Sequence, residues 1–216
     1  MKVSTFLVSF VLAEHLQDFI DRLKDRLLQR IHDIEFSGEE ITFTDAKRKN
    51  VTISHNVIYE HKTLAINYTT YDVWQDQDTI NPRTCADIML MSHEMGSNCH
   101  PYWYAWVIKI FHMFIRYSGQ DSPSHEVKCM DVLFVRWFGW EPGHRSGFSA
   151  HCLPRIGFLP EDDPDAFGFL DPNIVVYGVH LIPAFSLGKT EELLGRSFAR
   201  HANDDDKDWW LFYVNM

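Results

Sequence analysis

Histidine and cysteine are the residue types with which this chain could bind a metal ion. It holds 12 histidines and four cysteines, which are Cys85, Cys99, Cys129 and Cys152. The closest grouping is His93, Cys99 and His100, but there is no Cys-x-x-Cys pair and no pair of histidines four positions apart. Because structural zinc sites usually show such spacing, we predict no metal ion and expect free, mostly buried thiols.

The sequence also lacks a set of residues arranged for catalysis. His151 lies beside Cys152, but neighbouring residues of a strand point to opposite faces, so these two would not act as base and nucleophile. Gly188-Lys189-Thr190 matches the end of a phosphate-binding loop, yet Pro183 stands where that motif needs glycine. The acidic run 161–165 lacks the glycine and terminal glutamate of a calcium loop. We therefore predict a protein that is not an enzyme and binds no cofactor.

Aromatic side chains are the most concentrated candidates for a binding site. They gather in two short stretches, as Tyr102, Trp103, Tyr104, Trp106, Trp137, Phe138 and Trp140. Such rings can form a core, or they can bind a partner, for example by enclosing a methylated ammonium group through cation–π attraction. The sequence leaves both interpretations open. The residues that we expect at a partner-binding surface are Tyr102, Trp103, Tyr104, Trp137 and Trp140.

Charge argues against nucleic acid as the main partner. The chain carries 20 Lys and Arg against 30 Asp and Glu, a formal net charge of −10, whereas non-specific binding to nucleic acid depends on an excess of cations. A local basic groove is still compatible with this balance. Contact with nucleic acid is therefore the alternative function, and its candidate phosphate-binding residues are Arg83, Arg136, Arg145 and Arg155.

The elements that would position these residues are mostly short strands. Apolar residues recur at three- and four-residue steps over 10–33, which predicts an amphipathic helix that ends at Ser37-Gly38. Alternating patterns predict short strands at residues 41–44, 51–54, 57–59, 64–68, 87–92, 155–159, 179–182 and 209–214. Helical turns are expected at 171–176 and 190–194.

Two stretches are apolar on both faces and predict the centre of a sheet. Residues 102–117 have no polar helical face, so we expect a long, bent strand, and 130–138 predict its partner across an exposed loop. Together the patterns predict a mainly β fold, a small, partly open β-barrel with an N-terminal amphipathic helix.

The length of 216 residues, 45% of them apolar, fits one packed domain with a short appendage. We expect a helical segment at 1–38 and a β-rich domain at 39–216. The first 13 residues imitate a secretory signal, but their apolar phase continues into the predicted helix, so we expect an intracellular protein, nuclear or cytoplasmic. No apolar run is long enough to span a membrane, and the oligomeric state is left open.

Several strings of residues together resemble one family. They are Asn67-Tyr68-Thr69-Thr70-Tyr71-Asp72, Gln77-Asp78-Thr79-Ile80-Asn81-Pro82-Arg83-Thr84, Asp87-Ile88-Met89, His100-Pro101-Tyr102-Trp103-Tyr104-Ala105, Val135-Arg136-Trp137-Phe138-Gly139, Ala166-Phe167-Gly168-Phe169-Leu170-Asp171-Pro172 and His180-Leu181-Ile182-Pro183-Ala184-Phe185. They resemble the C-terminal region of Plavaka-type DNA transposon proteins of basidiomycete fungi, and the likeness covers most of the chain.

This resemblance implies a transposon-derived protein without catalytic residues of its own, because the family's catalytic domain lies upstream of the matching region. The chain departs from the family at Trp74, Gln75 and Trp106, where arginine is common, and at Cys85, where histidine is usual. These departures predict a decaying copy in which ancestral phosphate contacts are weakened.

A looser likeness, at the level of fold, is to the bromo-adjacent-homology domains of chromatin proteins. It rests on the predicted strands at 104–111 and 135–138, and fold alone does not carry function. The leading prediction is a non-catalytic module for interaction with protein or chromatin, derived from the tail of a fungal transposon protein. A degenerate fragment of that tail with no present role is the competing interpretation. The alternative is an accessory nucleic-acid-contacting domain of a transposase whose catalytic domain is missing here.

Overall fold

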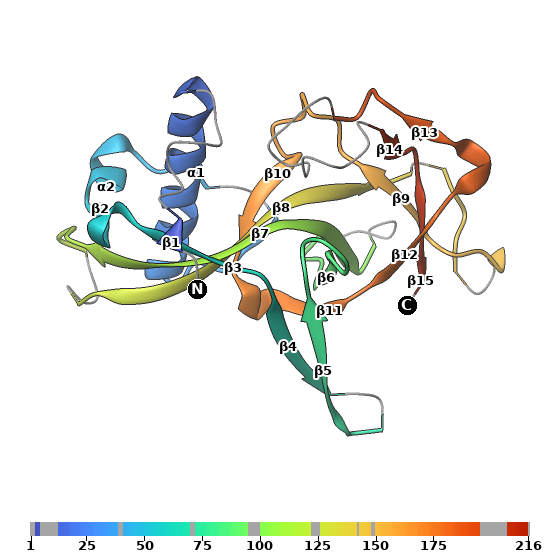
Figure 1. The fold of residues 1–216 in the computed structure, drawn as a ribbon, viewed down its shortest axis with the longest axis horizontal. Coiled ribbons are helices and arrows are strands. Elements are labelled where there is room, and N and C mark those ends of the chain that lie inside the picture. Colours follow the sequence, from blue (N-terminus) through green and yellow to red (C-terminus); the bar gives the residue numbers. More distant parts are fainter. Residues whose placement is uncertain are drawn as a thin grey trace.

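Two long strands organise the molecule. The computed structural model describes residues 3–4, 13–38, 41–69, 72–94, 100–121, 126–141, 143–147, 150–194 and 207–215. Figure 1 shows β7 (Tyr102–Tyr117) and β8 (Lys128–Trp140) running side by side across the molecule, with helices at one end and the C-terminal strands at the other. The prediction of a long strand at 102–117 is confirmed, and β8 contains the predicted partner strand at 130–138.

The β7–β8 hairpin is long and central because most of its residues are buried on both faces. Its antiparallel register runs from Tyr104 opposite Phe138 to Ile115 opposite Lys128. The register shifts between Val107 and Lys109, where β7 carries an extra residue. Such a bulge bends a strand and changes which positions face a given side, so the two ends of the hairpin present different sets of side chains.

Shorter strands extend both edges of this hairpin. Along β7 lie β2 (Val51–Ile53), β3 (Ile58–His61) and β6 (Asp87–Met91), and along β8 lie β9 (Arg155–Phe158) and β10 (Phe167–Leu170). The sheet continues through β1 (Val3–Ser4), β11 (Val175–Gly178), β12 (His180–Pro183) and β15 (Phe212–Asn215). Two separate pairs are β4 (Leu64–Thr69) with β5 (Gln75–Ile80), and β13 (Lys189–Thr190) with β14 (Asp208–Trp209).

The mainly β class is confirmed, but the strands do not close into a barrel among the residues that the structure describes. The main path through the sheet begins at β1 and ends at β12, and these two strands are not paired with each other. The likeness to bromo-adjacent-homology barrels therefore stays a prediction.

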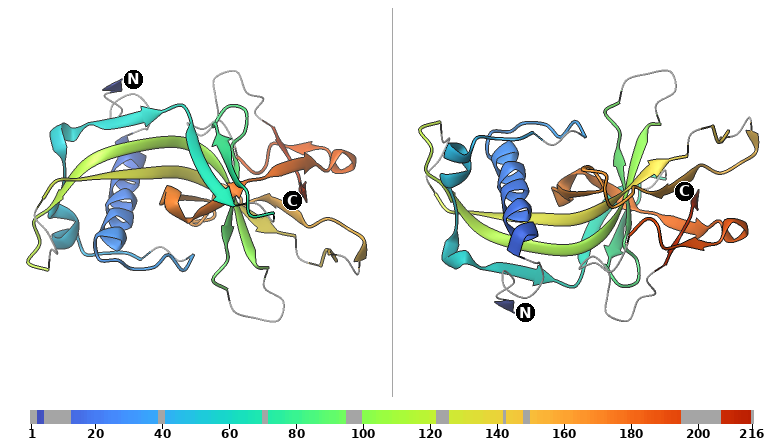
Figure 2. Two further views of the ribbon diagram at one scale, coloured as in Figure 1. Left: turned by 90° about the horizontal axis from the view of Figure 1, so that it is seen from below. Right: turned by 90° about the horizontal axis from the view of Figure 1, so that it is seen from above.

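Two α-helices and three 3-10 turns complete the described structure. Helix α1 (Ala13–Ile31) lies across the two long strands (Figure 2), and α2 (Asp45–Lys49) follows it. The 3-10 turns are η1 (Ser54–Asn56), η3 (Pro172–Ile174) and η4 (Phe185–Leu187). Helix α1 presents Leu23, Leu27, Leu28 and Ile31 to a core cluster that also contains residues of β7 and β8. Burial of each such side chain contributes about 1.5–3 kcal/mol, so α1 and the sheet stabilise each other.

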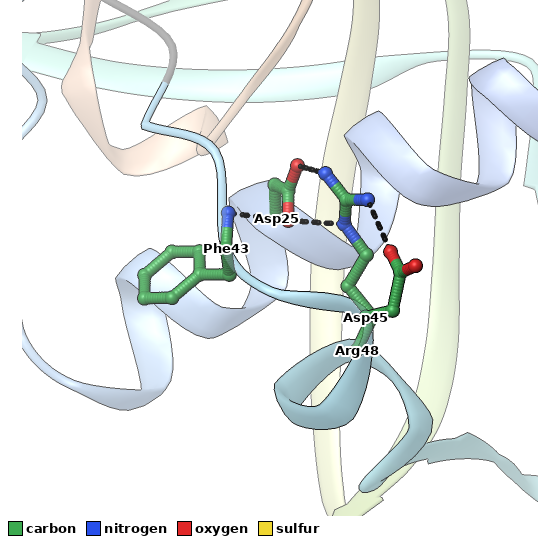
Figure 3. Close-up of polar contacts among 4 residues, drawn as sticks. All are labelled: Asp25, Phe43, Asp45 and Arg48. Atoms are coloured by element: carbon green, nitrogen blue, oxygen red, sulfur yellow. Dashed lines mark hydrogen bonds and ion pairs between the residues drawn. The ribbon is translucent and has the colours of Figure 1, made fainter.

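A buried carboxylate on α1 holds the segment that follows the helix. Asp25 accepts hydrogen bonds from Nε and Nη2 of Arg48, at 2.8 and 2.6 Å, and from the main-chain N–H of Phe43 at 3.2 Å (Figure 3). Hydrogen bonding to Asp25 raises the pKa of the Arg48 guanidinium. Arg48 also forms an ion pair with Asp45 at 3.1 Å. A bidentate arginine–carboxylate pair fixes orientation as well as distance, so the segment between the two helices has a defined path.

Two predicted elements were wrong, and several short elements were missed. Residues 41–44 form no strand, because the N–H of Phe43 is bound by Asp25 and its ring packs on the helix side of the core. Residues 190–194 form no helical turn. Thr190 instead pairs with Asp208, which is distant in the sequence. The missed elements include α2, β5, which has few apolar residues, and β10, which lies beside the acidic loop. The short helix expected at 171–176 is only the turn η3, because β11 begins at Val175.

Candidate functional site: an aromatic pocket

Strand alternation divides the predicted aromatic residues between the two faces of the β7–β8 hairpin. Tyr104 and Trp140 belong to a core cluster formed with β9, β12 and β15. Trp137 packs instead against the cluster that contains Ala105 and Val107. The predicted binding residues therefore do not make one surface, and each face has to be described separately.

The face that carries Tyr104 is sealed. Tyr104 is 1% exposed, and its ring meets the edge of Trp140 with centroids 5.9 Å apart. The ring centroids of His100 and Trp140 are 3.6 Å apart, and Tyr102 packs against the same cluster. Burial raises the pKa of the Tyr104 phenol. The expectation that Tyr104 belongs to a partner-binding surface does not fit this position, since its ring has no contact with solvent.

The opposite face carries an open arrangement of three rings, here called the aromatic box. Phe36 and Trp137 are nearly parallel, with centroids 6.2 Å apart and an interplanar angle of 13°. Trp103 stands almost perpendicular to both, at 6.1 Å and 77° from Phe36 and at 6.5 Å and 80° from Trp137. All three rings are half-buried. These centroid distances lie in the range of paired aromatic rings, and all three rings line the same pocket.

The segment after α1 supplies one wall of the aromatic box and shapes another. Gly38 has a φ of +94°, and a Cβ atom added there would lie 2.4 Å from Cη2 of Trp103. A glycine is therefore needed for the chain to pass this closely over the indole ring. Phe36 is also covered by Arg26, whose guanidinium carbon lies 4.4 Å from the ring centroid. The guanidinium therefore covers one face of the Phe36 ring, in the geometry of a cation–π contact.

A pocket of about 390 Å³ includes the aromatic box and two carboxylates. Its walls include Glu94 and Asp165, both exposed, and it extends to Phe167 and Leu159. Trp103 donates its Nε1–H to Oε1 of Glu94 at 3.1 Å, which fixes the indole beside the negative charge. Rings with negative faces and two nearby carboxylates form an environment that favours a cation.

Sequence reasoning placed Trp103, Trp137 and Trp140, which all line the pocket, among the candidates but missed Phe36, Gly38, Glu94 and Asp165. The residues of the pocket come from separate stretches of the chain, at 36–38, 94, 103, 137–140, 159, 165 and 167–169. One signal was available: Ser37-Gly38 was recognised as the end of the helix, and an aromatic residue beside a glycine is a common way to bring a ring close to a backbone. No spacing rule joins that signal to tryptophans of a remote hairpin.

The candidate arginines do not form a basic surface. Arg136 is 0% exposed, binds Asp208 at 2.8 Å and the carbonyl oxygen of Leu193 at 3.1 Å, and lies 3.9 Å from the centroid of Phe158. The prediction that Arg136 contacts phosphate does not fit this interior position. Its guanidinium instead links β8 to Asp208 of β14 and to the main chain at Leu193.

The other three arginines lie apart from Arg136. Arg155 forms an ion pair with Glu141, which raises the pKa of the guanidinium, and lies over the Tyr213 ring. Arg83 and Arg145 are exposed. A phosphate groove needs several cations on one face. Of the four candidate arginines, only Arg83 and Arg145 are exposed without a described ion pair, and they lie on separate loops.

The described thiols are less buried than predicted. Cys85 and Cys129 are exposed, so the expectation of buried thiols is wrong for them, and Cys99 lies outside the described residues. Cys152 Sγ lies 3.6 Å from Nε2 of His144, but that nitrogen also faces the carbonyl oxygen of Leu153 at 3.0 Å. A ring nitrogen that faces a carbonyl carries the proton, so it cannot take the proton of the thiol.

No family model matches the chain, and neither the curated proteins nor the solved structures gave a match. Among the described residues, no helix is long and apolar enough to cross a membrane.

Proposed function

We propose that this protein is a non-catalytic interaction module that binds a basic segment of a protein partner and holds one lysine-type ammonium group in the aromatic box. The observation that carries the proposal is the arrangement of Phe36, Trp103 and Trp137 as three walls beside Glu94 and Asp165. Histone tails are partners of this chemistry, so chromatin belongs to the proposal.

The physical argument rests on cation–π attraction. A cation near the face of an aromatic ring gains about 0.5–2 kcal/mol, and more as water is excluded. A methylated ammonium keeps its charge but is less tightly hydrated than a free ammonium, so it leaves water at a smaller cost. We therefore expect the aromatic box to prefer methylated lysine, with the two carboxylates adding attraction that salt screens.

Charge favours a basic protein over nucleic acid. The net charge of −10 and the carboxylates of the pocket repel phosphate. Of the four candidate arginines, Arg136 is buried against Asp208 and Arg155 is paired with Glu141. The electrostatic term that dominates binding to nucleic acid is therefore weak on this molecule.

The proposal includes an origin in the tail of a Plavaka-type fungal transposon protein, with a partly open, bromo-adjacent-homology-like sheet and a nuclear location. Its support is the set of sequence strings that resemble that family. Two of these strings, at 100–105 and 135–139, contribute Trp103 and Trp137 to the aromatic box. The residues of the resemblance and those of the pocket therefore overlap.

The test is calorimetric titration of the protein with lysine peptides that are unmodified, monomethylated or trimethylated. We expect saturable 1:1 binding that strengthens with methylation. Trp137→Ala should lower the affinity about tenfold, because the loss of one ring removes about 1.4 kcal/mol. Trp74→Ala is the matched control, since Trp74 is 74% exposed and lies outside the pocket.

Circular dichroism and the thermal midpoint establish that each variant is folded before it is titrated. Equal affinity of Trp137→Ala and Trp74→Ala would contradict the proposal. So would tighter binding to a single-stranded oligonucleotide than to any peptide, with an affinity that falls steeply as salt is added.

A further inference from the structure

Three strands place two imidazoles and a carboxylate together at the other end of the β7–β8 hairpin. His61 ends β3, His112 lies in β7 and Asp131 lies in β8. His112 is directly opposite Asp131 in the register, and His61 is opposite Ile110, two positions from His112. Residues two positions apart on a strand share a face, so all three side chains project from the same side of the sheet.

Their ligand atoms converge. Nε2 of His61 lies 2.6 Å from Nδ1 of His112, and one ligand atom from each of His61, His112 and Asp131 lies within 4.8 Å of the others. The histidines are partly buried and Asp131 is exposed, so the group opens to solvent on one side. The two imidazoles are stacked, with centroids 4.8 Å apart and planes 28° from parallel. A single ion with bonds of about 2.0–2.2 Å to each atom fits a cluster of this size after the two rings separate and rotate.

Neighbouring rings hold the His112 imidazole in place. Tyr59 stacks on it with centroids 4.8 Å apart and planes 10° from parallel, and Phe114 meets its edge at 5.6 Å. The main chain at Asp131 is held as well, because Arg30 donates to its carbonyl oxygen. Arg30 is itself neutralised by Asp171 at 2.7 Å. Fixed ligands with an open side are the usual form of a metal site that keeps positions for solvent or substrate.

We propose that His61, His112 and Asp131 bind a divalent transition metal ion, with Zn²⁺ as the reference ion. Two imidazole nitrogens and one carboxylate suit zinc and iron, whereas an oxygen-only set would suit calcium or magnesium. The proposal is independent of the aromatic box. It concerns the opposite end of the hairpin, and it reverses the expectation, drawn from sequence spacing, that the chain binds no metal.

The simpler explanation of the short His61–His112 distance is a hydrogen bond between neutral imidazoles, in which one ring donates N–H to the other. That explanation requires only two residues and gives Asp131 no role. A metal site requires all three. The contribution of Asp131 therefore separates the two explanations.

The experiment is a titration of the purified full chain with Co²⁺, followed by its visible absorption, and then competition with Zn²⁺. We expect one equivalent to bind and Zn²⁺ to displace it. His112→Ala and Asp131→Asn should each weaken binding by at least about tenfold, since even residues that only support a ligand contribute about 10–100-fold. Asp131→Asn keeps the size of the side chain and tests the role of the carboxylate.

Two matched controls remove other potential ligands. Cys129→Ser replaces an exposed thiol two positions from Asp131, and His180→Ala replaces an exposed histidine on β12. Both should bind Co²⁺ like the unaltered chain. The proposal is overturned if the unaltered chain binds no equivalent, if Asp131→Asn binds as tightly as His180→Ala, or if Cys129→Ser abolishes binding. Circular dichroism keeps a folding failure distinct from a loss of ligand.

Discussion

The two faces of the β7–β8 hairpin carry the same kinds of residue and use them differently. On one face Tyr104 is enclosed by the cluster of β9, β12 and β15, and the partly buried Trp140 packs against that cluster. On the other, Trp103 and Trp137 are covered only in part, by Phe36 and Gly38 from the segment after α1. Strand alternation assigns adjacent aromatic residues to opposite faces, and the elements that cover each face decide whether a ring is core or binding surface.

A dense run of aromatic residues in a strand is therefore not one functional unit. A face covered by strands of the same sheet leaves no room for a ligand, because strands pack their side chains closely. A face covered by a single turning segment keeps the ring faces accessible. Variants at adjacent positions, which differ mainly in the face they occupy, can test this comparison directly.

The largest effect is expected when a ring is removed from the sealed face. Tyr104→Ala should lower the free energy of unfolding by about 3–5 kcal/mol, since it leaves a large cavity in the core. Trp103→Ala, one residue away, should cost only about 1–2 kcal/mol because its ring is half-buried. Urea denaturation of both variants measures the difference. Equal losses would contradict the division into a sealed and an open face.

The second effect concerns Asp87, which lies on β6 opposite Trp106. Burial raises the pKa of its carboxyl from 3.8 to about 7. Between these values the unfolded chain loses the proton while the folded chain keeps it, so stability falls as pH rises from about 4 to 7. The full loss, reached above pH 7, is up to about 4 kcal/mol at 1.36 kcal/mol per unit.

Asp87→Asn tests that dependence. Denaturation midpoints from pH 4 to 8 should show a smaller decline in this variant than in the unaltered chain. Asp72→Asn, at an exposed position, is the control. An identical slope in all three proteins would mean that the Asp87 carboxyl is well solvated.

A smaller effect is expected at the glycine of the open face. Gly38→Ala should destabilise the fold by about 1–3 kcal/mol, because the new Cβ atom collides with Trp103 at a positive φ. It should also weaken peptide binding, since the indole has to move. Gly143→Ala is a matched control with a φ of +85° and no atom within 4 Å of the new Cβ. Denaturation and titration of both variants separate the collision from the backbone strain.

The smallest effect is electrostatic. Glu94→Gln keeps an oxygen for the Trp103 Nε1–H but removes the charge, and we expect a two- to fivefold loss of peptide affinity, about 0.4–1 kcal/mol. The loss should shrink at high salt. Glu126→Gln, exposed in the loop between β7 and β8, is the control. A salt-independent loss would assign Glu94 a purely structural role.

The sequence predicted the main elements well where periodicity was strong. Helix α1, β7 and β8 were all recognised, because their apolar patterns are long. The strand expected at 41–44 failed because a tertiary contact, the hydrogen bond from Phe43 to Asp25, replaced strand pairing. Strand β5, with the sequence Gln75–Ile80, has too few apolar residues to show alternation and is held by its partner β4.

The candidate sites were less accessible to sequence reasoning. Trp103 and Trp137 could be named, but Phe36 joins them only after the fold brings α1 and the hairpin together. His61, His112 and Asp131 have no helical or loop spacing in common, because a sheet assembles them across three strands. Cross-strand register determines which residues of neighbouring strands lie together in each site, and a single sequence does not reveal it.

The most direct measurement is a heteronuclear NMR titration that follows the indole N–H signals of the seven tryptophans while a trimethyl-lysine peptide is added. The proposed aromatic box predicts that the signals of Trp103 and Trp137 shift together and saturate, while those of Trp74 and Trp210, which lie outside the pocket, stay in place. Shifts confined to other tryptophans, or no saturable shift at any of them, would contradict the assignment of this open face as the binding site.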